Sequence, residues 1–219
     1  LGLSVAWLLW RERAQWRRIA PGLGVMLVVA GLVIAPVAKL ALVKPEMYFA
    51  RVQSTSLLRD RDVQRLLPAL AENTRKHLLM FNVAGDPNGR HNLPGAPLLD
   101  TISGALLFLG LGVTLRRANR LEMALLPVWA AVGLLGGILS LGFEAPQSLR
   151  SIAALPAVYL MVALPLGELA REWVTGPGRM VPALGVWIVL LFLLPIGLLN
   201  ARLYFTRQTS DFASWNAYS

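Results

Sequence analysis

MALLPVWAAVGLLGGILSLGF, residues 123–143, runs without a charged side chain between Glu122 and Glu144. A helix that crosses a bilayer needs roughly 20 consecutive apolar residues, because each residue advances the chain by about 1.5 Å and the hydrocarbon is about 30 Å thick. Backbone amides in lipid have no water to bond, so such a segment must be a helix. This stretch therefore predicts a transmembrane helix.

Further segments of the same kind lie on both sides of it. Residues 19–38 and 180–201 have the length of a full crossing, and 101–115 and 151–167 reach it if flanking residues extend to the headgroups. Residues 1–10 are too short to span and are interpreted as the end of a truncated helix. The predicted fold class is an all-α membrane protein with five complete transmembrane helices plus one truncated at the N-terminus.

Composition excludes several other classes of protein. Hydrophobic residues make up 56% of the chain and charged residues 15%, with a mean hydropathy of +0.57, so a soluble globule is not expected. The net charge of +9 does not indicate a nucleic-acid partner, because many basic residues flank membrane segments. Cysteine is absent and the two histidines are isolated, so no metal ligands and no certain cofactor are assigned. A divalent metal is left open.

The basic residues also predict an orientation. They concentrate in short segments at 11–18, 116–120 and 171–179, which the positive-inside rule places in the cytoplasm. The loop 44–98 and the C-terminal tail then lie on the non-cytoplasmic side. The expected location is the inner (cytoplasmic) membrane of a cell, with several crossings.

The predicted organisation has four parts along the chain. They are a truncated span, a cytoplasmic loop and a first full span in 1–43, an outward loop in 44–98, a four-span bundle in 99–200, and an outward tail in 201–219. The tail carries aromatic residues typical of a membrane interface, or of the beginning of an outer domain.

The outward loop contains an amphipathic pattern that predicts a helix. Asp60 is a suitable N-cap, and an apolar stripe follows at helical spacing: Val63, Leu66, Leu67, Leu70, Thr74, Leu78 and Phe81. Flanking basic residues suit a helix that lies in the membrane interface. Packing against an outer domain is the alternative.

After this helix the chain is rich in Gly and Pro. Asp86-Pro87-Asn88-Gly89 has the preferences of a type I turn, and Arg90, His91 and Asn92 follow it directly. This donor-rich triplet could bind a phosphate or a sugar hydroxyl, or it could simply solvate the loop.

A second outward loop reads LGFEAPQSLRSI, residues 141–152. If Pro146 begins a helix, Gln147 and Arg150 share one face, close to Glu144. These side chains either bind a lipid-linked phosphate or act as an ordinary interfacial anchor.

Two of these stretches resemble a known family. HLLMFNVAGDPNGRHNLPGAPLLD, residues 77–100, and FEAPQSLRSIAALP, residues 143–156, are similar to bacterial polytopic membrane glycosyltransferases of the GT-C superfamily, related to protein O-mannosyltransferases and the aminoarabinose transferase. The order of spans and loops is similar over most of the chain. The resemblance implies the C-terminal portion of such a membrane domain.

The resemblance also implies a function. A sugar would pass from a polyprenyl-phosphate carrier to an unidentified acceptor on the outer face of the membrane, with carrier phosphate or sugar contacts from Arg90, His91, Asn92, Glu144, Gln147 and Arg150. The family's catalytic carboxylate lies in an earlier outward loop, so the catalytic residues are unassigned and enzymatic activity of this fragment is uncertain. Membrane lipid and the sugar donor are the expected partners. The alternative is a non-catalytic integral membrane subunit that scaffolds a larger membrane complex.

Overall fold

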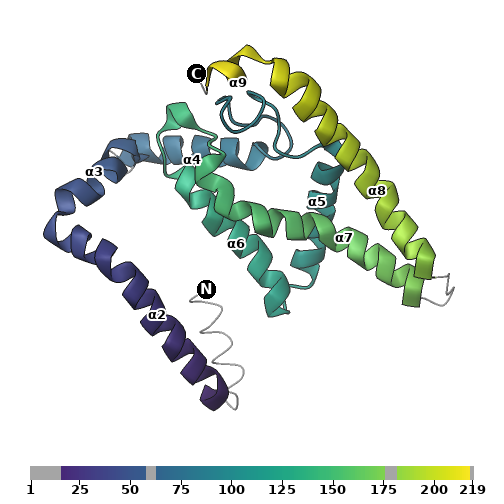
Figure 1. The fold of residues 1–219 in the computed structure, drawn as a ribbon, viewed down its shortest axis with the longest axis horizontal. Coiled ribbons are helices and arrows are strands. Elements are labelled where there is room, and N and C mark those ends of the chain that lie inside the picture. The colour runs from purple at the N-terminus through teal and green to yellow at the C-terminus, as the bar shows by residue number, and fades with distance from the viewer. Residues whose placement is uncertain (1–15, 58–62, 176–181, 218–219) are drawn as a thin grey trace. The chain divides into compact units, whose positions relative to one another are not determined.

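The structure is a computed structural model that describes residues 16–57, 63–175 and 182–217 (Figure 1). No β-strand occurs among these residues, so the all-helical prediction is confirmed there. The chain divides into two compact units, Leu1–Arg59 and Asp60–Ser219, and each is described by itself. The predicted truncated helix in 1–10 and the predicted N-cap Asp60 lie outside the described residues, as do residues 176–179 of the third basic segment.

The described part of the first unit, residues 16–57, contains the helices α2 (Trp16–Val43) and α3 (Pro45–Thr55). Helix α2 begins earlier than the predicted span, so Arg17 and Arg18 lie within it and not in a preceding loop. Helix α3 occupies part of the segment predicted as outward loop and begins with a proline, which is well tolerated in the first helical turn.

Where the second unit is described, it contains five longer α-helices and a short C-terminal one. They are α4 (Val63–Leu79), α5 (Thr101–Arg116), α6 (Leu121–Ile138), α7 (Leu155–Thr175), α8 (Pro182–Arg202) and α9 (Phe212–Asn216). Helix α7 packs against α5, α6 and α8. The core between them includes Met80, Leu106, Leu134 and Met161, all almost fully buried.

Four helical segments are long and apolar enough to cross a membrane: Ala20–Val43, Leu121–Ile138, Leu149–Glu172 and Val189–Ser210. The described part of the chain therefore supports four of the five complete spans that the sequence predicts. The fifth, α5, forms a helix as expected, but its 16 residues fall short of a straight crossing.

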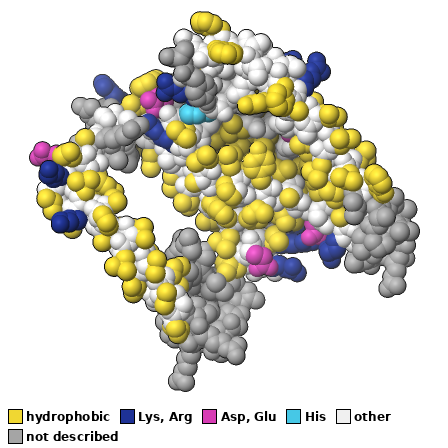
Figure 2. Space-filling model, viewed as in Figure 1, with side chains coloured by type: hydrophobic (Ala, Val, Ile, Leu, Met, Phe, Trp, Pro, Cys, Tyr) yellow, Lys and Arg dark blue, Asp and Glu magenta, His cyan; other side chains and the backbone are white. Residues whose placement is uncertain are grey.

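Hydrophobic side chains cover much of the outer surface of these helices, whereas charged side chains gather near their ends (Figure 2). On α8, for example, Leu191 and Leu194 are 70% and 67% exposed. An apolar surface of this extent is unfavourable in water and is expected where lipid surrounds the helices.

Polar contacts connect neighbouring segments at each end of the bundle. At one end, Arg117 pairs with Glu168 on α7 through two hydrogen bonds of 2.6 and 2.8 Å. At the other end, Asp100 caps α5 and accepts a 2.9 Å hydrogen bond from Asn200 on α8. This second end also holds the segments 80–99 and 139–154, as the predicted alternation of loops requires. Which end faces the cytoplasm stays a prediction.

Helix α4 lies where the sequence predicts a helix and ends at Leu79, two residues before the end of the predicted stripe. Its packed face differs from that stripe. Leu67 and Leu78 are 62% and 60% exposed, whereas Asn73 and His77 are almost completely buried. The helix packs through this polar face because its side chains bond backbone groups at the end of α6 and in the following loop.

Candidate functional site

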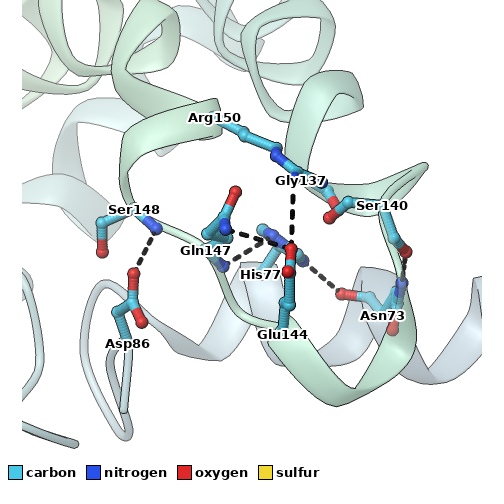
Figure 3. A network of polar contacts seen from close by, with 9 residues as sticks. All are labelled: Asn73, His77, Asp86, Gly137, Ser140, Glu144, Gln147, Ser148 and Arg150. Carbon is cyan, nitrogen blue, oxygen red and sulfur yellow. Dashed lines mark hydrogen bonds and ion pairs between the residues drawn. The ribbon is translucent and has the colours of Figure 1, made fainter. Parts of the chain in front are cut away.

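The two stretches at residues 77–100 and 143–156 meet around His77 (Figure 3). His77 Nδ1 lies 2.7 Å from the Asn73 carbonyl oxygen, and Nε2 lies 3.1 Å from the backbone nitrogen of Gln147. A carbonyl can only accept and a backbone N–H can only donate, so the proton of the neutral ring resides on Nδ1. Burial lowers the pKa of His77, which favours this neutral form.

Asn73 lies one helical turn before His77 and holds the end of α6. Its Nδ2 donates to the carbonyl oxygens of Ile138 and Ser140, at 3.0 and 2.8 Å. The last carbonyls of a helix have no partner within the helix, so this side chain supplies one. The absence of a side chain at Gly137 lets α4 pack closely against the end of α6, since a Cβ there would lie only 2.3 Å from His77 Nε2.

Asp86 provides a second connection between the two stretches. Its side chain is buried, with Oδ2 accepting from the Ser148 N–H and Oδ1 from the Asn88 N–H, both at 2.8 Å. The Asp86 carbonyl accepts from Gly95, and the hydrogen-bonded turn joins Asn88 to His91. The turn thus lies two residues later than the sequence indicates, because the Asp86 side chain bonds backbone groups itself.

Glu144, Gln147 and Arg150 lie together, as predicted. One carboxylate oxygen of Glu144 accepts from Gln147 Nε2 at 3.2 Å and pairs with Arg150 at 3.1 Å. The expected helix from Pro146 is not present, because the 3₁₀ helix η4 begins at Leu149. Gln147 therefore precedes the helix and reaches Glu144 from an irregular segment.

A cavity of about 250 Å³ opens beside these groups. It is lined by Asp86, Pro87, Asn88, Phe143, Glu144 and Gln147. A bulk water occupies about 30 Å³, so the cavity has room for several waters or for one sugar ring. Its polar lining is rich in acceptors, and the buried Oε1 of Gln147 has no partner among the described residues. Such a site suits a ligand that presents hydroxyl or ammonium donors.

The other three predicted residues lie elsewhere. Arg90 and His91 line a larger cavity beside the C-terminal segment. Asn92 bonds the carbonyl oxygens of Ala96 and Pro97, at 3.3 and 3.4 Å, and so holds its own loop. Two of the six residues therefore line each cavity and Asn92 makes a loop contact. The sixth, Arg150, pairs with Glu144 but belongs to neither cavity lining.

Sequence reasoning did not single out Asn73, His77 or Asp86 as site residues. The four-residue spacing of Asn73 and His77 was a usable signal, because it places both on one face of a helix. Their partners, 60 to 70 positions away, leave no such signal. As for metals, residues 16–57, 63–175 and 182–217 hold no group of three or more Asp, Glu or His able to ligate an ion.

No family model, curated protein or solved structure matches this chain. The class that the geometry itself defines is an all-helical protein with helices able to span a membrane and a polar, loop-built site at one end of its bundle.

Proposed function

We propose that this chain is part of a membrane glycosyltransferase that moves a sugar from a polyprenyl-phosphate carrier to an acceptor on the outer face of the membrane. The observation that carries the proposal is the joining of the two stretches that resemble this family. His77 bonds Gln147 and Asp86 bonds Ser148, so residues far apart in the sequence build one cavity.

The cavity offers the chemistry that a sugar needs. Glu144 and Asn88 carry oxygen atoms that can accept from ring hydroxyls, which are donors, and Gln147 belongs to the same lining. Their backbone is held by buried contacts, and a site that is already ordered loses less entropy when the ligand binds.

Arg150 would act on the leaving group. When the glycosidic bond breaks, the carrier phosphate gains negative charge, and a nearby guanidinium stabilises it. The ion pair with Glu144 fixes the direction of the Arg150 side chain. The carboxylate that would activate the acceptor remains unassigned.

The test is transfer of a labelled sugar from a polyprenyl-phosphate donor by the full-length protein carrying Arg150→Ala. We expect a loss of about 100-fold or more in rate, as for removal of one transition-state donor, with normal membrane insertion. Arg75→Ala is the matched control, because Arg75 forms an ion pair with Glu72 on an exposed face of α4. Arg150→Lys keeps the positive charge but removes the planar guanidinium, so it separates the effect of charge from that of hydrogen-bond geometry. Unchanged turnover in Arg150→Ala would remove Arg150 from the site.

One observation favours the scaffold alternative. Glu144 bonds both Gln147 and Arg150, and such internal pairing also suits a purely structural loop. A scaffold subunit predicts that Arg150→Ala leaves transfer unaffected and weakens assembly with its partner, so the same variant distinguishes the two functions.

The proposal also includes the topology, with α5 as a further crossing and the cavity on the non-cytoplasmic side. Residues 1–219 contain no cysteine, so single cysteines can be introduced for labelling. Val83→Cys and Phe143→Cys, at positions 62% and 81% exposed, should react with an impermeant maleimide in intact cells. Arg120→Cys should react only after permeabilisation. Labelling of the first two on opposite sides would refute the arrangement.

A further inference from the structure

The segment after α8 changes its helical geometry before it folds back. Leu203–Arg207 forms a π-helical turn, η5, and Gln208–Ser210 a 3₁₀ turn, η6, which lead into α9. π-helical turns are uncommon and occur frequently at functional sites, because the wider turn redirects the side chains that follow. Tyr204 lies in this turn and Gln208 directly after it.

Helix α9 packs on the loop that carries Arg90. A Cβ on Gly89 would lie 2.7 Å from the Ala213 carbonyl oxygen, so the two backbones touch where only glycine fits. Arg90 Nε donates a 2.8 Å hydrogen bond to the Ala217 carbonyl oxygen. These contacts place the tail of the chain beside the 88–91 turn.

A cavity of about 580 Å³ lies between the turn and the tail. Its lining includes two aromatic rings and several hydrogen-bonding side chains, among them Arg90, His91, Tyr204, Gln208, Ser214 and Trp215. Its volume falls in the range of small-molecule sites, roughly 300–1,000 Å³. Ser214 is 6% exposed, and its buried hydroxyl has no partner among the described residues.

The charge of this cavity is opposite to that of its neighbour. No Asp or Glu belongs to its described lining, which instead has the Arg90 guanidinium and the His91 imidazole. Asp86 and Glu144 line the smaller cavity. A ligand of the larger cavity should therefore carry negative charge.

We propose that the cavity formed by the 88–91 turn and the C-terminal segment is a binding site for an acidic carbohydrate, a saccharide that bears a carboxylate or phosphate. The C–H face of a sugar ring packs on aromatic rings, which Tyr204 and Trp215 provide at 56% and 70% exposure. Gln208 and the Ser214 hydroxyl suit the sugar hydroxyls, and Arg90 suits the acidic group.

This site is separate from the Glu144 cavity and goes beyond the proposed transfer. The cavity lies where the candidate span Val189–Ser210 ends, so both a lipid-anchored and a soluble saccharide could reach it. Binding is measurable without an acceptor or turnover. The binding proposal can therefore be refuted while the proposed sugar transfer stands, and the transfer can be refuted while the binding proposal stands.

Titration calorimetry of the detergent-solubilised full-length protein tests the proposal with cellobiouronic acid and cellobiose, which differ in one carboxylate. We expect the acidic disaccharide to bind about tenfold or more tightly, as expected for one charge-assisted hydrogen bond. The same acidic sugar on a lipid anchor in nanodiscs tests whether the natural ligand is soluble or lipid-linked. Binding of the soluble form assigns a soluble ligand, and binding of the anchored form alone assigns a lipid-linked one.

Variants at the cavity assign the binding to these residues. Arg90→Gln, Trp215→Ala and Gln208→Ala should each weaken binding of the acidic sugar about tenfold. Phe212→Ala and Arg207→Gln are matched controls, because both side chains are exposed and neither lines the cavity. Gln208→Ala removes neither the Arg90 contact to Ala217 nor the Trp215 contact to Thr209, so it reports on the ligand even if the tail shifts in the other two.

Three results would overturn the proposal. They are the absence of binding by either form of the acidic sugar, equal losses in the control variants, and inorganic phosphate binding as tightly as the saccharide. The last would show an anion site that ignores the sugar. In the first of these cases, binding of anionic vesicles that depends on Arg90 would assign the cavity to a lipid contact.

Discussion

Replacing His77 with Phe isolates the polar contribution of the site, because it keeps an aromatic ring at a fully buried position. The variant loses the 2.7 Å bond to Asn73 and the 3.1 Å bond from Gln147. Each neutral hydrogen bond contributes about 1 kcal/mol, and a buried group left without a partner costs about 1–3 kcal/mol. We expect a loss of about 2–4 kcal/mol in the free energy of unfolding.

The assay is denaturant unfolding of the full-length protein in detergent, followed by tryptophan fluorescence. Met80→Leu is the matched control, because Met80 is equally buried just after α4 and this exchange roughly conserves volume. It should cost less than about 1.5 kcal/mol. If His77→Phe unfolds within about 0.5 kcal/mol of the wild type, or if Met80→Leu is as damaging, the network does not hold the two stretches together.

Three further outcomes are expected. Because burial lowers the pKa of His77, the folded state resists protonation of the ring. This contribution to the free energy of unfolding is complete above the pKa of the unfolded chain, about 6.5, and falls as the pH drops below it. Unfolding curves measured between about pH 8 and pH 5 should show this dependence on pH in the wild type and lose it in His77→Phe. Gly137→Ala places a Cβ 2.3 Å from Nε2 and should cost about 2 kcal/mol or more by the same unfolding assay, whereas a cost near zero would show that the ring moves aside freely. Arg117→Gln should lower stability slightly in the same assay. The losses from Arg117→Gln and Glu168→Gln should be less than additive, because each variant removes the same bidentate pair; additive losses in this double-mutant cycle would contradict the pairing.

The helices of this protein are predictable because lipid imposes a simple rule. A charge-free segment long enough to cross must satisfy its own backbone, so 123–143 and 180–201 correspond to α6 and α8. Helix α3 lacks that signal, since its longest apolar run, residues 47–50, is only four residues long. The sequence therefore predicts this segment as part of a loop.

The candidate site is less predictable, because its contacts are non-local. Residue types and short spacing suffice to group Glu144, Gln147 and Arg150. Nothing local shows that Asp86 bonds the Ser148 backbone, 62 positions away, or that this bond displaces the turn. When a side chain bonds a backbone group, any residue type can supply that backbone group. The sequence at the backbone partner therefore does not indicate the contact.

Helix α4 connects these observations. In an amphipathic helix the apolar residues are expected on the packed face. In α4 that face instead carries Asn73 and His77, because they satisfy backbone groups that no water reaches. The helix can then leave Leu67 and Leu78 exposed on another face. We infer that the membrane interface covers this apolar face, since an exposed stripe flanked by basic residues is stabilised there. The acceptor-rich cavity, connected to the buried face of α4 through His77, would then lie near the depth of a lipid headgroup.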